Sequence, residues 1–274
     1  MRRIKTILKD GIILDKIYVQ LVNKPEVNPV KLIANATRLT FKPGIPFSST
    51  FMDDENELNK YDVPMVQNLI SADHSPLEHC SYSILVAGAS RSFLAQIRTH
   101  RLASFTSASQ HYTNWKDADY EVPIEVFEKC EELNSVEPLK YFMDEYTRSQ
   151  KAYIDAQEKF EFDHSVARQL TEQGMRNNLL ITANVREWLT ILGLRECGRN
   201  TSEIAYVSWL IRDVLTKECP EIFGKCGPSC FRAGKCKEGK LCCGKPWIDG
   251  INPDTSRWQQ CAQLGKKWRN ELNN

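Results

Sequence analysis

The chain has 274 residues, of which 42% are hydrophobic and 26% are charged, as in ordinary globular proteins. This length suits one large domain or one domain with a small appendage. The formal net charge of +1 excludes a strong global attraction to nucleic acid, and the apolar runs are too short to cross a bilayer. Charged residues also interrupt the N-terminal stretch MRRIKTILKDGIILD, which excludes a signal-peptide core. We therefore expect a cytoplasmic protein without a membrane partner.

The apolar spacing and the turn and capping signals in the first half of the chain predict a sheet with several helices. Residues 4–21 have strand-like apolar spacing around an Asp10-Gly11 turn signal, and Asn28-Pro29 is a typical start for a helix that ends near Arg38. Residues 42–60 have the composition of a polar loop. Residues 64–71 indicate a helix, and residues 82–86 a buried strand. A helix over residues 90–97 then leads into an irregular, polar loop.

The second half is predicted to be helical. After a loop region over 113–134 with one short helical piece, the apolar spacing indicates helices over 137–160, 163–170, 184–194 and 202–217. The expected fold class is α+β, with an N-terminal mixed or antiparallel sheet and its helices, followed by a helical half. We expect one domain over residues 1–220 and a Cys- and Trp-rich tail over residues 221–274.

The tail has its own composition. Six cysteines lie between residues 219 and 243, another follows at residue 261, and three tryptophans lie at residues 247, 258 and 268. Without a secretory signal, clustered cysteines favour a metal or reduced thiols over disulfides. The spacing offers enough ligands for zinc or an iron–sulfur cluster, but it lacks C-x-x-C pairs. Reduced structural thiols are the preferred interpretation, and a metal is the alternative.

The stretch from Gln96 to Tyr112, QIRTHRLASFTSASQHY, carries the clearest chemical signal. Arg98, His100 and Arg101 fall within four residues, and several hydroxyl side chains follow. Cations followed by small hydroxyl donors suit a multiply charged anion such as a phosphate. A solvated helix end would explain the same pattern, and the spacing alone does not decide between the two.

Two further polar groups occur elsewhere in the chain. The first is a cluster at residues 75–79, and the second consists of polar residues on or near the predicted helices: Arg168, Asn184, Arg186, Arg195 and Glu203. Single arginines on helices are usually solvated, but several near helix ends, together with a cationic loop, favour an anion site. The sequence contains no G-x-S-x-G, P-loop, G-x-G-x-x-G or H-E-x-x-H pattern. A reaction here is therefore expected to use a bound cofactor, with the protein positioning the reactants.

Seven sequence blocks, taken together, resemble the flavin-dependent thymidylate synthases across roughly residues 20–220. In the family's order, the blocks are Asn-Ala-Thr-Arg38, Ser75-Pro-Leu-Glu-His79, Gln96-Ile-Arg-Thr-His-Arg101-Leu-Ala-Ser104, Ser109-Gln-His-Tyr112, Val-Ala-Arg168, Thr182-Ala-Asn-Val-Arg186, and Leu194-Arg195 with Glu203-Ile204 behind it. The family's signature is an Arg-His-Arg triplet with a serine at a fixed distance. His100, Arg101 and Ser109 keep that spacing.

The resemblance implies a methyltransferase that converts dUMP to dTMP by reductive methylation. It implies FAD as the bound cofactor, NADPH and methylenetetrahydrofolate as co-substrates, and a homotetramer with active sites at subunit junctions. In that chemistry no enzyme cysteine attacks the pyrimidine. Arg195 matches the family's arginine beside the pyrimidine, which stabilises N3 as it ionises, so Arg195 is the expected catalytic residue.

The resemblance also implies two sets of binding residues. The expected flavin-binding residues are Ser75, Thr99, His100, Arg101, Ser107, Asn184, Arg186 and Thr190. The expected nucleotide-binding residues are Gln96, Ile97, Arg98, Thr99, Ser107, Ala108, Ser109, Gln110, His111, Arg168 and Arg195. No metal ligand belongs to either set.

Several positions depart from the family pattern. Thr99 stands in place of the triplet's first arginine, and His111 stands in place of another arginine. Ser107 replaces Glu or Gln, and Thr190 replaces asparagine. Losing an arginine from a phosphate site typically costs a few kcal/mol, unless a neighbour such as Arg98 compensates.

The departures leave two alternatives to thymidylate synthesis. One is an altered reaction on the same scaffold, with another pyrimidine nucleotide as acceptor or with hydroxymethyl transfer. The other is a nucleotide- or nucleic-acid-binding module without catalysis. The near-zero net charge counts against nucleic acid as the ligand.

Overall fold

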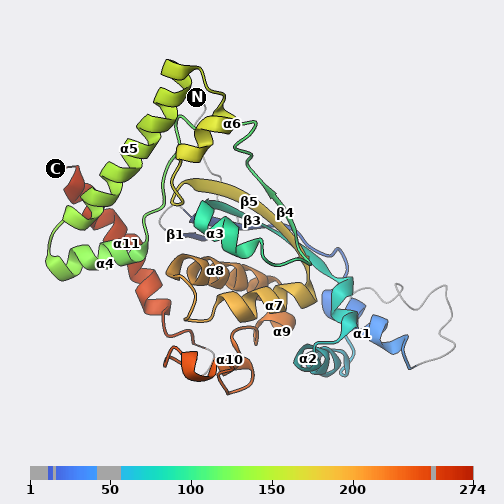
Figure 1. The fold of residues 1–274 in the computed structure, drawn as a ribbon. Coiled ribbons are helices and arrows are strands. Elements are labelled where there is room, and N and C mark those ends of the chain that lie inside the picture. The colour runs from blue at the N-terminus through green and yellow to red at the C-terminus, as the bar shows by residue number, and fades with distance from the viewer. Residues whose placement is uncertain (1–11, 15–16, 42–56, 248–250, 274) are drawn as a thin grey trace.

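A five-stranded sheet, in the order β1-β2-β3-β5-β4, forms the centre of the fold (Figure 1). The computed structural model of the chain describes residues 12–14, 17–41, 57–247 and 251–273. The strands are β1 (Ile12–Leu14), β2 (Ile17–Asn23), β3 (Ser81–Ser90), β4 (Ser104–Ser107) and β5 (Arg176–Asn184). The predicted turn at Asp10-Gly11 and most of the predicted loop over 42–60 lie outside the described residues.

The observed sheet is larger than the predicted N-terminal sheet. Strands β4 and β5 come from segments for which the sequence predicted a loop or no element, and β5 lies between β3 and β4. Along β5, Leu179, Ile181 and Ala183 are buried and alternate with more exposed residues, which is the period of a half-buried strand. All pairings among the described strands are antiparallel. Of the two predicted alternatives, a mixed or an antiparallel sheet, the structure therefore has the antiparallel one.

The helical segments agree with most of the predicted ones, so the α+β class is confirmed. The helices are α1 (Pro29–Arg38), α2 (Asp62–Ala72), α3 (Arg91–Ile97), α4 (Ile124–Leu133), α5 (Glu137–Phe160), α6 (His164–Ala167), α7 (Val185–Arg195), α8 (Ser202–Glu218), α9 (Pro220–Phe223), α10 (Ser229–Arg232) and α11 (Thr255–Leu272), with short 3-10 turns η1 (Ser75–His79), η2 (Arg168–Leu170) and η3 (Gly239–Leu241). Local capping explains two of the helix starts. The Asn28 side chain accepts from the amides of Val30 and Lys31, and the Asn184 side chain accepts from the amide of Glu187.

The main hydrophobic core lies between the sheet and helices α7 and α8 (Figure 1). Val86 and Ile181 from the sheet and Trp188 from α7 are fully buried there. The indole Nε1 of Trp188 donates to the carbonyl of Tyr82 at 3.1 Å, so this large side chain is buried without an unpaired polar atom. Burial of each such side chain stabilises the fold by roughly 2 kcal/mol, and together these side chains hold α7 firmly against the sheet.

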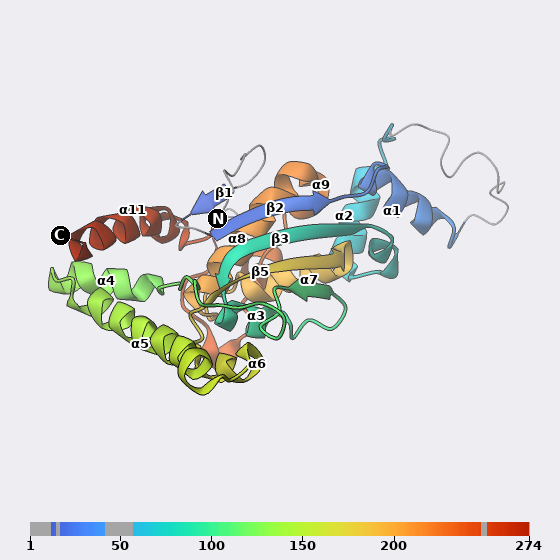
Figure 2. The same ribbon diagram turned by 90° about the horizontal axis from the view of Figure 1, so that it is seen from above.

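A second, smaller core lies among α4, α5 and α11, which extend from one end of the sheet (Figures 1 and 2). Trp268 of α11 is buried in it, and its Nε1 donates to Glu131 of α4 at 2.6 Å. Arg257, in the first turn of α11, donates to Glu128 of α4 through two nitrogens. Helix α11 therefore adds a third layer to the pair formed by α4 and α5, although the sequence predicted no element there.

The segment after α8 also contributes to the main core, since Cys226 and Trp258 are buried in it. Among the helices of the described residues, none combines the length and the apolar composition that a membrane span requires.

Candidate active site

Arg195, the last residue of α7, is held by three acceptors. Its Nε donates to Nε2 of His100 at 3.0 Å, and its Nη2 donates to the carbonyl of Gln96 at 3.1 Å and to the hydroxyl of Thr99 at 2.6 Å. Partial burial lowers the pKa of the guanidinium from its ordinary value, but an arginine stays charged near neutral pH. The described part of the chain offers no partner to Nη1 of Arg195, so this nitrogen can donate to a ligand.

His100 is buried between Arg195 and Glu187. Since a guanidinium can only donate, Nε2 of His100 must be the acceptor, and Nδ1 therefore carries the hydrogen and donates to Glu187 at 3.2 Å. Burial, and then the positive charge of Arg195, lower the pKa of His100 from 6.5 to about 4, so the imidazole is neutral at pH 7. Burial raises the pKa of Glu187. A line of hydrogen bonds thus connects the first turn of α7 to its last residue.

The turn after α3 brings Thr99 and His100 to α7. The amide of His100 donates to the carbonyl of Ile97, whose side chain is buried in the main core and anchors the turn. The Thr99 hydroxyl donates to the Gln96 carbonyl at 2.9 Å while it accepts from Arg195. An arginine at position 99 has no acceptor atom in its side chain and could not make the second bond. Thr99 therefore helps to orient Arg195.

Three arginines gather on the open side of α3. The pKa of Arg91 is lowered by burial and then by the like charges of Arg168 and Arg98, so Arg91 lies close enough to each of the other two to be repelled by it. Arg91 and Arg98 are seven residues apart, which puts them on the same face of the helix. Arg98 donates to the hydroxyl of Ser107, and among the described residues no carboxylate forms an ion pair with any of the three arginines. Uncompensated cations of this kind are suited to binding a phosphate.

The segment from Ser107 to His111 is fixed by backbone contacts to β5. The Ala108 amide donates to the carbonyl of Asn178 at 3.3 Å, and the Asn177 side chain donates to the carbonyl of Ala108 at 3.2 Å. The Ser109 hydroxyl accepts from the His111 amide at 3.1 Å. Gln110 is buried and donates to Thr171 at 3.4 Å. The expected nucleotide-binding loop is therefore a rigid extension of β4.

Arg186 joins the first turn of α7 to the segment around η1. Its Nε and Nη2 donate to the carboxylate of Asp73 at 3.0 and 3.2 Å, and its Nη1 donates to Glu78 at 2.6 Å. The Thr190 hydroxyl donates to the carbonyl of Arg186 at 3.1 Å. Two acids outnumber one guanidinium here and leave one excess negative charge, so this region suits a neutral ligand group with hydrogen-bonding edges better than it suits a phosphate.

Helix α7 therefore connects the three polar groups that the sequence singled out. Arg195 and Glu187 reach the stretch at 96–112, and Arg186 reaches residues 73–79. Ser75 and Arg101, which belong to these two segments, are exposed. Arg101 makes no hydrogen bond or ion pair with any described residue. Ile97 behaves differently, because its buried side chain leaves only its backbone for a ligand.

Two residues of this arrangement were missed by the sequence predictions. Arg91 had a usable signal, its spacing of seven residues from Arg98 on a predicted helix. Glu187 had none, since its partner His100 is 87 residues away.

The described cysteines are all free thiols, and in the described part of the chain no group of three or more His, Cys, Asp or Glu side chains is arranged to hold a metal ion. Burial raises the pKa of Cys226, which is in the main core. Cys230, Cys236, Cys242 and Cys243 lie instead along a cavity beside α7, together with Cys197.

Comparisons with known proteins point to one family. A family model described as thymidylate synthase complementing protein matches residues 20–221. The chain is 28% identical over 235 residues to a flavin-dependent thymidylate synthase of Clostridium tetani, covering 80% of this chain and 90% of that protein. It is 28% identical over 235 residues to the protein of that name from Nitratidesulfovibrio vulgaris (82% and 93%), and 29% identical over 238 residues to that from Thermococcus onnurineus (83% and 91%).

Proposed function

The chain belongs to the thymidylate synthase complementing protein family, and we propose that it catalyses the flavin-dependent reductive methylation of dUMP to dTMP with methylenetetrahydrofolate and NADPH. The observation that carries this proposal is the fixed guanidinium of Arg195, which is oriented by a neutral His100 and by Thr99 and donates to the carbonyl of Gln96. A fixed cation with one free donor favours the anionic form of a neighbouring ring nitrogen. A pyrimidine takes such an anionic form when its N3 loses a proton.

The donors around the start of α7 fit a flavin. The ring of an oxidised flavin is neutral and accepts hydrogen bonds along one edge, and the fixed donors of Arg186, held by Asp73 and Glu78, suit such a ring. Ser75 offers a hydroxyl, and Asn184 retains its amide hydrogens because only its oxygen is used in capping α7. Arg101 offers a free guanidinium. When bound, a reduced flavin supplies the hydride for the transferred carbon, and these side chains would orient its ring.

The arginine cluster would hold the nucleotide. A phosphate dianion near Arg91 would relieve its repulsion by Arg98 and Arg168, and the Ser107 hydroxyl accepts from Arg98 on the adjoining segment, which also carries Ser109. The Gln96 side-chain oxygen accepts from Thr201 at 3.2 Å, which leaves its amide hydrogens for the base. Arg195 would then donate from Nη1 to the pyrimidine.

Thr99 and His111 are the reason to consider an altered acceptor, but neither departure by itself requires one. The Thr99 hydroxyl has its own role in orienting Arg195, so its presence does not require a different substrate. Arg91 adds a positive charge near Arg98, so a phosphate would meet several cations without an arginine at position 111.

We also propose a homotetramer with active sites at the subunit junctions. Leu102 and Tyr112 flank the expected nucleotide loop and are 73% and 82% exposed. Large apolar side chains this exposed beside a binding site are typical of a surface that a further subunit covers. Light scattering coupled to gel filtration would give the mass of the assembly, and a monomer would contradict this arrangement.

The test of the flavin assignment is the visible spectrum of the purified protein after incubation with FAD and desalting. We expect a yellow protein with the two bands of an oxidised flavin. Arg195→Ala should retain those bands and lose turnover, and Arg148→Ala, on the exposed face of α5, should change neither. A wild-type protein that remains colourless after this treatment would refute the flavin assignment.

A further inference from the structure

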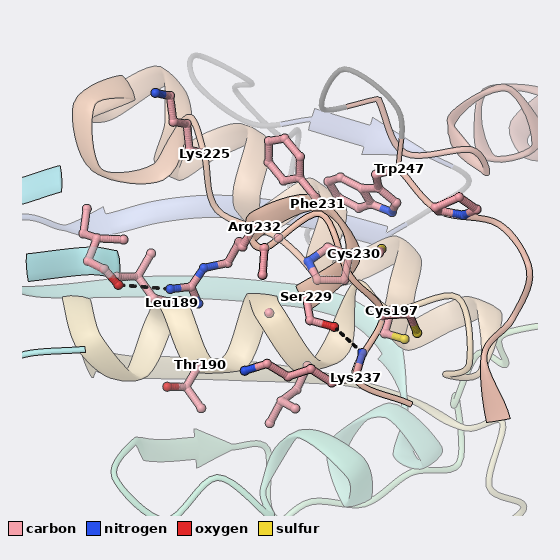
Figure 3. Close-up of a pocket in the computed structure, with 18 of the residues that line it drawn as sticks. Leu189, Thr190, Cys197, Lys225, Ser229, Cys230, Phe231, Arg232, Lys237 and Trp247 are labelled. Carbon is pink, nitrogen blue, oxygen red and sulfur yellow. Dashed lines mark hydrogen bonds between the residues drawn. The ribbon is translucent and has the colours of Figure 1, made fainter. Parts of the chain in front are cut away.

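Five cysteines line one cavity of about 890 Å³ between α7 and the chain that follows α9 (Figure 3). Cys197 lies just after the end of α7, and the other four come from the C-terminal segment: Cys230, Cys236, Cys242 and Cys243. All five are free thiols. Since no three described His, Cys, Asp or Glu side chains are arranged to hold a metal ion, contacts between pairs of these thiols decide their chemistry.

The segment from Cys236 to Cys242 folds back on itself. The amide of Leu241 donates to the carbonyl of Glu238 at 3.0 Å, and the amide of Cys242 donates to the carbonyl of Gly239 at 3.2 Å. These bonds form the turn η3, in which Gly239 has φ of +56°, a left-handed conformation that favours glycine. The turn brings the side chains of Cys236 and Cys242 into a hydrogen bond with each other. Two sulfur atoms in such contact need only a local movement to reach the roughly 2 Å of a disulfide bond.

This turn is attached to the rest of the fold. The amide of Lys237 donates to the hydroxyl of Ser229 in α10 at 3.1 Å, a hydrogen bond that Figure 3 shows beside Cys197. The carboxylate of Glu238 forms an ion pair with Arg199, in the connection between α7 and α8. The two sulfur atoms therefore meet in a turn that has fixed supports.

The two thiols of the pair differ in how readily they ionise. The sulfur of Cys242 accepts from the amide of Gly244 at 3.5 Å. This amide, and then the Cys236 thiol that also donates to the sulfur, lower the pKa of Cys242. The amide of Glu238 lowers the pKa of Cys236, but the contacts with Cys242 and partial burial raise it by more, so its pKa lies above the ordinary value. Because the thiolate is the nucleophile, Cys242 is the attacking thiol of the pair and Cys236 is the proton donor.

Access and charge also favour a reaction at Cys242. Of the cysteine side chains that the structure describes, Cys242 alone is exposed. The negative charge of Glu238 opposes the ionisation of Cys242 and raises its pKa, but Arg199 pairs with that carboxylate. Burial raises the pKa of Cys197, and the thiol of Cys243 donates to a backbone carbonyl at 3.8 Å. These two neighbouring thiols are therefore less suited to attack.

We propose that Cys236 and Cys242 form a reversible disulfide by exchange with a small-molecule disulfide. The Cys242 thiolate attacks one sulfur of the small disulfide, whose S–S bond breaks and whose other half leaves as a thiolate. Cys236 then loses its proton and attacks the sulfur of Cys242, which releases the second half. Two protein thiols are oxidised by two electrons, the small disulfide is reduced to two thiols, and the two cysteine protons end on these thiols. The pair lies outside the range matched by the family model, and the proposal does not depend on the proposed function.

The test is disulfide mapping of the reduced, full-length protein during incubation with hydroxyethyl disulfide. Samples are alkylated at intervals and digested, and the peptides are identified by tandem mass spectrometry. We expect a disulfide between Cys236 and Cys242 that dithiothreitol removes. Cys242 should react about tenfold faster than Cys230, a partly buried thiol that lines the same cavity. This readout requires neither flavin nor turnover.

Three serine variants separate the roles of the thiols. Cys236→Ser should accumulate a mixed disulfide on Cys242, because the second thiol is missing, and in Cys242→Ser the reaction of Cys236 should be about tenfold slower. Cys243→Ser, the matched control, removes the adjacent thiol and should behave as the wild type does. Circular dichroism should confirm that the variants fold, and the wild-type map decides the matter for any that does not. A disulfide that maps to another pair such as Cys197 and Cys243, a mixed disulfide that persists on wild-type Cys242, or a Cys242 that reacts no faster than Cys230 would each overturn the proposal.

Discussion

Replacing His100 with glutamine tests whether the imidazole beside Arg195 is neutral. A glutamine side chain can accept from Arg195 with its oxygen and donate to Glu187 with its nitrogen, as the neutral histidine does. It cannot take up a proton. The wild type and His100→Gln should therefore differ in how their stability depends on pH, even where their stabilities at neutral pH are similar.

The magnitude follows from the pKa of His100, which is 6.5 ordinarily and about 4 in the folded protein. The unfolded chain binds this proton as the pH falls below about 6.5, whereas the folded protein binds it only below about 4. Folding is therefore progressively disfavoured between these two values. The full effect is about 3 kcal/mol, and about 2 kcal/mol of it should appear by about pH 5.

The assay is urea unfolding followed by circular dichroism, for both proteins, at about pH 7.5 and about pH 5. The wild type should lose about 2 kcal/mol more than His100→Gln over this interval. Glu187, whose pKa is raised by burial, is present in both proteins, so its contribution cancels in the comparison. Equal losses in the two proteins would refute a neutral His100 and the hydrogen-bond directions inferred from it.

Three further substitutions test other parts of the structure. Arg168→Ala should raise the KM for dUMP about tenfold with a smaller change in kcat, and an unchanged KM in steady-state assays would remove Arg168 from the phosphate site. Thr99→Val deletes one acceptor of Arg195 and should lower kcat about tenfold while the flavin spectrum stays the same; a loss of flavin instead would contradict the positioning role. Trp258→Ala should lower the free energy of unfolding by about 3–5 kcal/mol in urea titrations, and a loss below about 1 kcal/mol would show that α11 is not part of the cooperative core.

The local signals of the sequence predicted most helices but not the whole sheet. The capping side chains of Asn28 and Asn184, and the apolar spacing of α5, α7 and α8, are contained within each segment. Strand β5 is different, because its residues pair with β3 residues that lie 86 to 103 positions earlier in the chain. Helix α11 was missed because its described buried side chains, chiefly Trp258 and Trp268, are few and separated by polar residues. Tertiary contacts with α4 decide the structure of that segment.

The candidate site was predictable as a set of residues but not as a geometry. Sequence blocks placed His100, Arg101 and Arg195 in one family pattern, yet the hydrogen bond from Arg195 to His100 joins residues 95 positions apart. In the family pattern Thr99 is a departure from an arginine, whereas in the structure its hydroxyl accepts a hydrogen bond from Arg195 and helps to orient it. Such contacts depend on how the turn after α3 meets α7, which no local pattern encodes.

The central claim is tested most directly by the mass of the nucleotide product. The FAD-loaded protein is incubated with dUMP, methylenetetrahydrofolate and NADPH, and the nucleotides are separated and weighed by mass spectrometry. We expect a product that differs from dUMP by one carbon and two hydrogens, as dTMP does, and that disappears with Arg195→Ala. A product that also carries an additional oxygen, or dUMP that remains unconsumed by the yellow wild-type protein, would contradict thymidylate synthesis.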